Sequence, residues 1–223
     1  MIETDFNETI ALRVMHYLRD QILVYQTYKK GDKLVESDIA EKLNISRAPV
    51  RDALRQLENQ GLVNSVPRKG TYVADYSSES LEEIYDLRFI LECRIYEVLT
   101  EQNLLSNEDF ILMEELVDQM GKIARSSVDF ESKISEFLFK DVEFHKFTWS
   151  KARRPHTKKI LTDLYNQLKL GMFEDLLHER DLQAIVHNHR MIIEDLRKGD
   201  LEEIKKGRAH SLFGRRVSNI GKA

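Results

Sequence analysis

Three polar residues fall on helix faces that are otherwise apolar, and their side chains could bind a metal ion. Asp141 and His145 lie four residues apart, so both project from one face of a helical segment. His189 lies on the apolar stripe of a second segment, whereas His187 falls on the opposite face. A buried carboxylate beside imidazoles suits a divalent metal, with water in the open coordination positions. The same residues could form a hydrogen-bonded core network without metal, and spacing alone favours that simpler arrangement.

A second set of residues suits contact with DNA. After Ser46, apolar side chains share one helix face, and Arg47, Arg51 and Arg55 form a basic stripe beside it. Arg47 and Arg51 are near the N-terminal end, which is the end of a recognition helix that enters the major groove, where arginine reads guanine bidentately. Ser46 and the first backbone N–H groups can meet a phosphate at the positive end of the helix dipole. The alternative is a solvated helix face on a domain that binds another protein.

The elements before residue 76 have the order of a winged helix-turn-helix. Helical periodicity covers 9–28 and 36–43, and a third helix starts after Ser46, tolerates Pro49 in its first turn and ends at Gly61. Two runs of β-forming residues follow, separated by a turn whose basic residues predict the tip of a wing. The runs are 62–66 and 71–74, and the turn is Pro67-Arg68-Lys69-Gly70.

After this region we find only helical periodicity. It predicts six helices, at roughly 80–100, 107–125, 131–149, 156–177, 181–198 and 201–219. The expected fold is therefore mainly α. It comprises an N-terminal winged helix-turn-helix domain, residues 1–76, and a C-terminal all-α helical bundle of about six helices, residues 77–223.

Composition excludes several classes of protein. The 223 residues are 42% hydrophobic and 32% charged, with nine Gly and three Pro, which excludes collagen, low-complexity disorder and a nucleotide-binding fold built on glycine turns. Cys93 is the single cysteine and no apolar run approaches the length of a membrane span, so we expect a cytoplasmic protein with no membrane partner. The net charge of −4 arises from the part after residue 75. DNA would therefore be bound through shape and local charge, because bulk attraction is lacking.

The segment 30–63 resembles the GntR family of bacterial transcription regulators. It matches the pattern G-x-x-L-x-E-x-x-L-A-x-x-L-x-V-S-R-x-P-V-R-x-A-L-x-x-L-x-x-x-G-L-V at nearly every fixed position. Val35 departs from it, because the family usually has a small polar residue or proline there, and this weakens the cap of the second helix. The resemblance implies DNA-contacting roles for Ser37, Ser46, Arg47, Pro49, Arg51, Arg68, Lys69 and Gly70.

The C-terminal helices resemble the ligand-binding FCD domain of the FadR-type branch of that family. Asp141-Val142-Glu143-Phe144-His145 is similar to its D-x-x-F-H motif, and His189 followed by Gly199-Asp200 is similar to H-x9-G-D. The resemblance implies that an aspartate and three histidines hold a divalent metal, which we predict to be zinc with nickel or manganese as alternatives, beside an effector cavity. The third histidine usually aligns with Ser211, whereas His210 comes one residue early. His210 is therefore a ligand only if a local shift turns it inward.

Arg88 lies on the apolar stripe of the predicted helix 80–100, and an inward arginine needs a partner. Glu92, one turn further on, could supply an ion pair. Alternatively, Arg88 binds the carboxylate of an effector, since this R-x-x-x-E pair also resembles the family.

These features predict a sequence-specific, DNA-binding transcription regulator, a repressor released by an organic or sugar acid. A homodimer reading a short palindromic operator in double-stranded DNA is expected, because two-fold symmetry doubles the few base contacts of one domain. The rival prediction is a helical metal-dependent enzyme that uses the Asp/His site. The sequence has no H-E-x-x-H motif and no E-x-x-H pair of the di-iron bundles, which counts against that rival.

Overall fold

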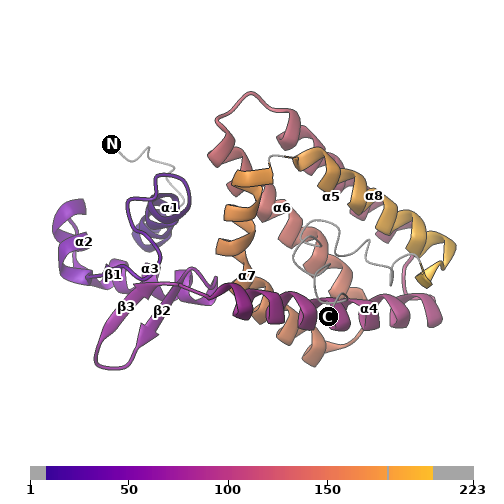
Figure 1. Cartoon of the computed structure of the whole chain (residues 1–223), viewed down its shortest axis with the longest axis horizontal. Helices are drawn as coiled ribbons and strands as arrows, with labels where there is room; N and C mark the ends of the chain where they lie inside the picture. The colour runs from indigo at the N-terminus through magenta and orange to yellow at the C-terminus, as the bar shows by residue number, and fades with distance from the viewer. Residues whose placement is uncertain (1–8, 180, 203–223) are drawn as a thin grey trace. The chain divides into compact units, whose positions relative to one another are not determined.

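The chain forms two compact units, Met1–Tyr76 and Ser77–Ala223. A computed structural model describes residues 9–179 and 181–202 (Figure 1). The first unit combines three helices with a small sheet, and the described residues of the second unit form helices and no strand. The predicted fold class, mainly α with an N-terminal winged helix-turn-helix and a C-terminal helical bundle, is confirmed.

The helices of the first unit surround a small apolar core. α1 (Ile10–Leu23) starts at Thr9, whose hydroxyl accepts a hydrogen bond from the Leu12 N–H at 3.2 Å. It packs on α3 (Arg47–Asn59), and α2 (Glu36–Leu43) packs on the same helix. The predicted helix 9–28 was too long, because Gln26 adopts a φ of 48°, which is incompatible with continued helix.

The sheet of the first unit has the strand order β1-β3-β2, with both pairs antiparallel. β2 (Val63–Val66) and β3 (Gly70–Val73) form the predicted hairpin. β1 (Lys33–Leu34) adds the third strand, with Lys33 opposite Tyr72. Sequence analysis missed β1, because two residues are too few to show an alternating pattern.

The turn of the β2–β3 hairpin has an unusual backbone. Lys69 donates its N–H to the Val66 carbonyl at 3.0 Å, which closes the turn, and Arg68 has a φ of 64°. Gly70 follows with a φ of 111°, a conformation that L side chains rarely adopt. A Cβ at Gly70 would also lie 3.0 Å from Cε of Lys33 on β1. The wing therefore requires glycine at this position.

The second unit contains five helices within the described residues. They are α4 (Ser78–Glu101), α5 (Asn107–Arg125), α6 (Phe130–Lys151), α7 (Pro155–Glu179) and α8 (Leu182–Lys198). α6 packs against both α5 and α7, while α7 also contacts α4 and α5 also contacts α8. The sixth predicted helix, 201–219, falls almost entirely outside the described residues. None of the helices in the described part of the chain is long and apolar enough to cross a membrane.

Gly70→Ala should weaken the wing, because alanine brings both backbone strain and a close contact with Lys33. We expect amides in the segment 63–73 to exchange with deuterium about 10-fold faster, corresponding to about 1.4 kcal/mol of local stability. Lys69→Ala in the same turn is the control and should leave the exchange rates unchanged. Equal protection in Gly70→Ala and the wild type would contradict this account of the turn.

Candidate functional site

The basic face of α3 is exposed, and its apolar face is buried. Four apolar residues of α3 are each at most 3% exposed, as the periodicity predicted: Val50, Ala53, Leu54 and Leu57. Arg47, Arg51 and Arg55 are exposed on the same helix. Ser46 precedes α3 with extended backbone angles, as expected of an N-cap, but its side chain makes no capping hydrogen bond. The hydroxyl of Ser46 is exposed at the positive end of the helix.

Two of the three arginines, Arg51 and Arg55, pair with carboxylates in different ways. The Arg51 guanidinium forms a two-pronged contact with Glu36 at the start of α2, with Nε–Oε1 at 3.1 Å and Nη2–Oε2 at 2.8 Å. The hydrogen bond from Arg51 holds the pKa of Glu36 below its ordinary value. Arg55 is only loosely paired with Asp52, at 3.9 Å.

The wing residues Arg68, Lys69 and Gly70 are all exposed at the hairpin turn. Pro49 is half-buried in the first turn of α3. Ser37, near the start of α2, donates its hydroxyl hydrogen to the Asp38 carboxylate at 2.9 Å. The predicted DNA-contacting residues thus lie on the α2–α3 pair and the wing of one compact unit.

The second unit brings three of the predicted metal ligands together in its core. Asp141 and His145 come from α6 and His189 comes from α8, and each residue is no more than 2% exposed. One potential ligand atom from each residue lies within 4.8 Å of those of the other two. His210, the fourth predicted ligand, lies outside the described residues.

One acceptor atom of His189 faces one acceptor atom of Asp141. Nδ1 of His189 lies 2.9 Å from the Ile185 carbonyl, which can only accept, so the ring proton of a neutral imidazole sits on Nδ1. Nε2 then carries a lone pair, and it lies 3.1 Å from Oδ1 of Asp141. Both atoms are buried, and neither has a hydrogen-bond partner among the residues that the structure describes. Two facing acceptors are stabilised by a cation or a proton between them.

His145 is oriented from both sides of its ring. Nη2 of Arg88 lies 3.0 Å from Nε2 of His145, and because a guanidinium can only donate, this nitrogen is the acceptor. The proton of the neutral ring therefore sits on Nδ1, where Oε1 of Glu92 lies 2.9 Å away. The Nε2 lone pair of His145 is thus engaged by Arg88, and Oδ2 of Asp141 lies 3.9 Å from the same nitrogen.

Several charged or polar side chains around the cluster are almost fully buried. Arg88 donates from Nε to Glu92 at 3.2 Å, so the predicted ion pair exists. The Trp149 indole N–H donates to the same carboxylate at 3.1 Å. The Tyr165 hydroxyl donates to Oδ2 of Asp141, and the Arg88 guanidinium lies over the Tyr165 ring, 4.6 Å from its centroid.

Sequence analysis missed Trp149 and Tyr165, because both read as apolar members of helix stripes. Trp149 follows His145 by one helical turn, and this spacing is the available sequence signal for its place beside the cluster. Tyr165 comes from α7, and nothing in the sequence links it to Asp141.

The protonation states suit metal binding. Burial raises the pKa of Asp141, but the attraction of its carboxylate to the His145 and His189 rings when these are protonated, and to the Arg88 guanidinium, lowers it by more, so the net shift is downward. Burial lowers the pKa of His145, despite the opposing effect of Glu92. An ionised aspartate and a neutral histidine are the forms that bind metal.

The charges of the cluster also fit a cation. With neutral imidazoles, the buried set contains two carboxylates, Asp141 and Glu92, and one cation, Arg88. One negative charge is therefore uncompensated among these side chains, next to the two facing acceptors. The donor set of one carboxylate and two imidazoles suits a divalent metal with open positions.

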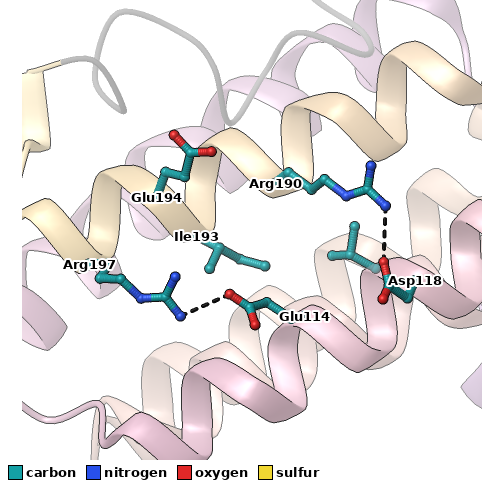
Figure 2. A pocket seen from close by; sticks show the side chains of 7 residues that line it. Glu114, Asp118, Arg190, Ile193, Glu194 and Arg197 are labelled. Carbon is teal, nitrogen blue, oxygen red and sulfur yellow. Dashed lines mark hydrogen bonds and ion pairs between the residues drawn. The ribbon is translucent and has the colours of Figure 1, made fainter.

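A groove of about 320 Å³ opens on the surface between α5 and α8 (Figure 2). Its charged side chains pair with one another across the two helices: Arg190 with Asp118 at 3.0 Å, and Arg197 with Glu114 at 2.9 Å. These contacts connect α5 to α8, the helix that carries His189. Two arginines of the groove are therefore engaged by carboxylates of α5.

Comparison with known proteins identifies both parts of the chain. Residues 10–73 match the family of bacterial regulatory proteins named gntR, and residues 83–210 match the FCD domain. The gluconate operon transcriptional repressor of Bacillus subtilis (strain 168) is 28% identical over 198 residues, covering 85% of this chain and 76% of the repressor. The regulator McbR of Escherichia coli (strain K12) is 23% identical over 215 residues, covering 95% of this chain and 91% of McbR.

Solved structures share the fold. The structure of E. coli McbR/YncC superposes with a TM-score of 0.68 at 18% identity, covering 96% of this chain and 98% of that one. A GntR regulator from Rhodococcus sp. RHA1 gives a TM-score of 0.65 at 20% identity, covering 96% of this chain and 98% of that one. The chain therefore belongs to the GntR family of bacterial regulatory proteins, and its FCD domain follows the winged helix-turn-helix of a DNA-binding transcription regulator.

Proposed function

We propose that this regulator is a homodimeric repressor that binds a divalent metal and a small carboxylate in its helical domain, and leaves its operator when the carboxylate binds. The observation that carries the proposal is the pair of facing acceptors, Asp141 Oδ1 and His189 Nε2, which are buried 3.1 Å apart in a cluster whose described side chains leave one negative charge uncompensated. The protein acts in the cytoplasm, where bacterial DNA is found.

Residues 1–76 form the DNA-binding domain in this proposal. Arg47 and Arg51 project from the N-terminal half of α3, where a recognition helix reads base edges in the major groove. Ser46, Pro49 and Ser37 contact the DNA backbone beside that helix. Arg68 and Lys69, on the wing, contact the neighbouring groove or its phosphates, and Gly70 permits the turn. Dimerisation through residues 77–223 places two such domains on a short palindrome.

Asp141, His145 and His189 hold the metal in this proposal, with His210 as a fourth ligand. The bound ion, zinc or alternatively nickel or manganese, supplies positive charge that an effector carboxylate can bind. Arg88 supplies the second positive group. Its Nη2 is engaged by His145 Nε2 here, and it becomes available to a carboxylate when that nitrogen binds metal. The similarity to a gluconate operon repressor makes sugar acids and other organic acids the first effectors to test.

The cluster does not favour an enzyme. Glu92, the carboxylate that a metal-dependent hydrolase would need as a general base, accepts hydrogen bonds from Arg88 and Trp149 and is fully buried. We therefore propose that the metal serves ligand binding and that the chain is not an enzyme.

Arg47→Ala and Arg51→Ala should each weaken binding to the operator by about 5- to 150-fold, which corresponds to the ~1–3 kcal/mol of a bidentate base contact. The operator would be selected by the full-length wild type from a random duplex library, and affinity measured by fluorescence anisotropy. Arg190→Ala removes an exposed arginine from α8 and is the charge-matched control. Wild-type affinity in both α3 variants would refute the recognition-helix assignment.

His189→Ala should abolish tight zinc binding, because it removes one of the three donors in the cluster. We expect the Kd for zinc to rise by at least about 100-fold, since losing a residue that merely orients a ligand costs about 10–100-fold. Metal-free protein would be titrated against a chelating dye. His187→Ala, an exposed histidine on the same helix, should bind zinc like the wild type. Equal zinc affinity in the two variants would exclude the metal site.

A carboxylate effector should stabilise the metal-loaded protein and lower its affinity for the operator. At about 100 times its Kd, a ligand specific to the folded state adds about 2.7 kcal/mol, enough to raise Tm by several degrees. Gluconate and related acids would be screened by thermal shift with zinc and after chelation. The shift should require zinc, and a carboxylate that shifts Tm equally in chelated protein would contradict this arrangement.

A further inference from the structure

Arg51 differs from its neighbours on α3, because a carboxylate from another helix fixes its guanidinium. Glu36 is the first residue of α2 and lies fifteen positions before Arg51 in the sequence. Its two oxygens contact the Nε and Nη2 side of the guanidinium at 2.8 to 3.2 Å. The pair is not buried, since the Arg51 side chain is 55% exposed and that of Glu36 is 32% exposed.

This contact leaves a specific part of the guanidinium available. Arginine has five N–H donors on a rigid plane, and a carboxylate on the Nε/Nη2 side leaves the edge formed by Nη1 and Nη2. Two parallel donors of that kind match the O6 and N7 acceptors of guanine. The plane of the guanidinium is set by Glu36, so this free edge has a defined direction relative to α3.

Such an ion pair has little effect on stability, because an exposed pair contributes only about 0–1 kcal/mol. Its effect on the conformational freedom of Arg51 is larger, since arginine is among the side chains that lose most rotamer entropy when they are ordered. An arginine that is already ordered loses less on binding DNA.

We propose that Glu36 is a positioning residue for base recognition: it orients Arg51 so that its free guanidinium edge reads guanine. This inference rests on the proposed DNA-reading role of α3. Glu36 also places a negative charge close to the DNA phosphates, which lowers affinity for every sequence alike. Glu36 therefore increases sequence discrimination at the expense of non-specific affinity.

The test uses the full-length protein and its selected operator. Glu36→Gln removes the charge and the two-pronged contact while preserving the size of the side chain. Asp52→Asn is the matched control, because it removes one carboxylate from α3 itself, beside the loosely paired Arg55. Arg51→Ala and the Glu36→Gln/Arg51→Ala double variant complete a double-mutant cycle.

We expect Glu36→Gln to lower the preference for guanine at the base pair read by Arg51 by about 3- to 10-fold, the loss expected from an unordered side chain. Its affinity for random DNA should rise, as should that of Asp52→Asn. Asp52→Asn should keep the wild-type base preference, and Glu36→Gln should have no effect on base preference once Arg51 is alanine. Thermal unfolding should be the same in all variants.

Two results would overturn the inference while leaving the regulator itself intact. Unchanged guanine preference in Glu36→Gln would show that the pair does not position Arg51. A stronger preference would show that Glu36 withholds Arg51 from DNA. In both cases the wild type still selects a specific operator, whereas a wild type that selects none refutes the DNA-reading role of α3 as well.

Discussion

The core of the helical unit contains buried charged side chains, and it is stable only because these side chains contact one another. Arg88, Glu92 and Asp141 are each at most 5% exposed, and burying any of them alone would cost several kcal/mol. Arg88 meets Glu92 through Nε and His145 through Nη2, and its plane lies over Tyr165. One guanidinium thus links α4, α6 and α7, and the order of the polar core follows from its position. One guanidinium cannot balance both Glu92 and Asp141, and the negative charge that remains among these side chains suits a metal ion.

Much of the fold was predictable from local patterns. The apolar face of α3, the residue at which it starts and the turn of the wing were all readable from period and turn residues. Each of Asp141, His145 and His189 interrupts an apolar stripe, which predicted that all three side chains point into the core, and the resemblance to the FCD domain predicted that they form one metal site. The Arg88–Glu92 pair was readable as well, since its members are one helical turn apart.

The rest depends on contacts between segments that are distant in sequence. Arg88 and His145 are 57 positions apart, and nothing in either helix predicts that a guanidinium donates to the imidazole. Trp149 and Tyr165 look like ordinary core aromatics, because only the packed helices show where the indole N–H and the hydroxyl point. The end of α1 was missed for a different reason: the left-handed φ of Gln26 overrides a helical pattern that continues in the sequence.

The two arginine–carboxylate pairs of this chain illustrate how burial changes the role of the same interaction. Arg88–Glu92 lies in a low-dielectric core, so either member without the other would be an uncompensated buried charge that destabilises the fold. Arg51–Glu36 lies in water, where each member is readily solvated alone and where salt screens their attraction. Stability therefore does not require the exposed pair. Its two-pronged geometry still holds the Arg51 guanidinium in one plane. The pair therefore determines the direction in which the free guanidinium edge points, and this direction matters on a surface that reads base edges.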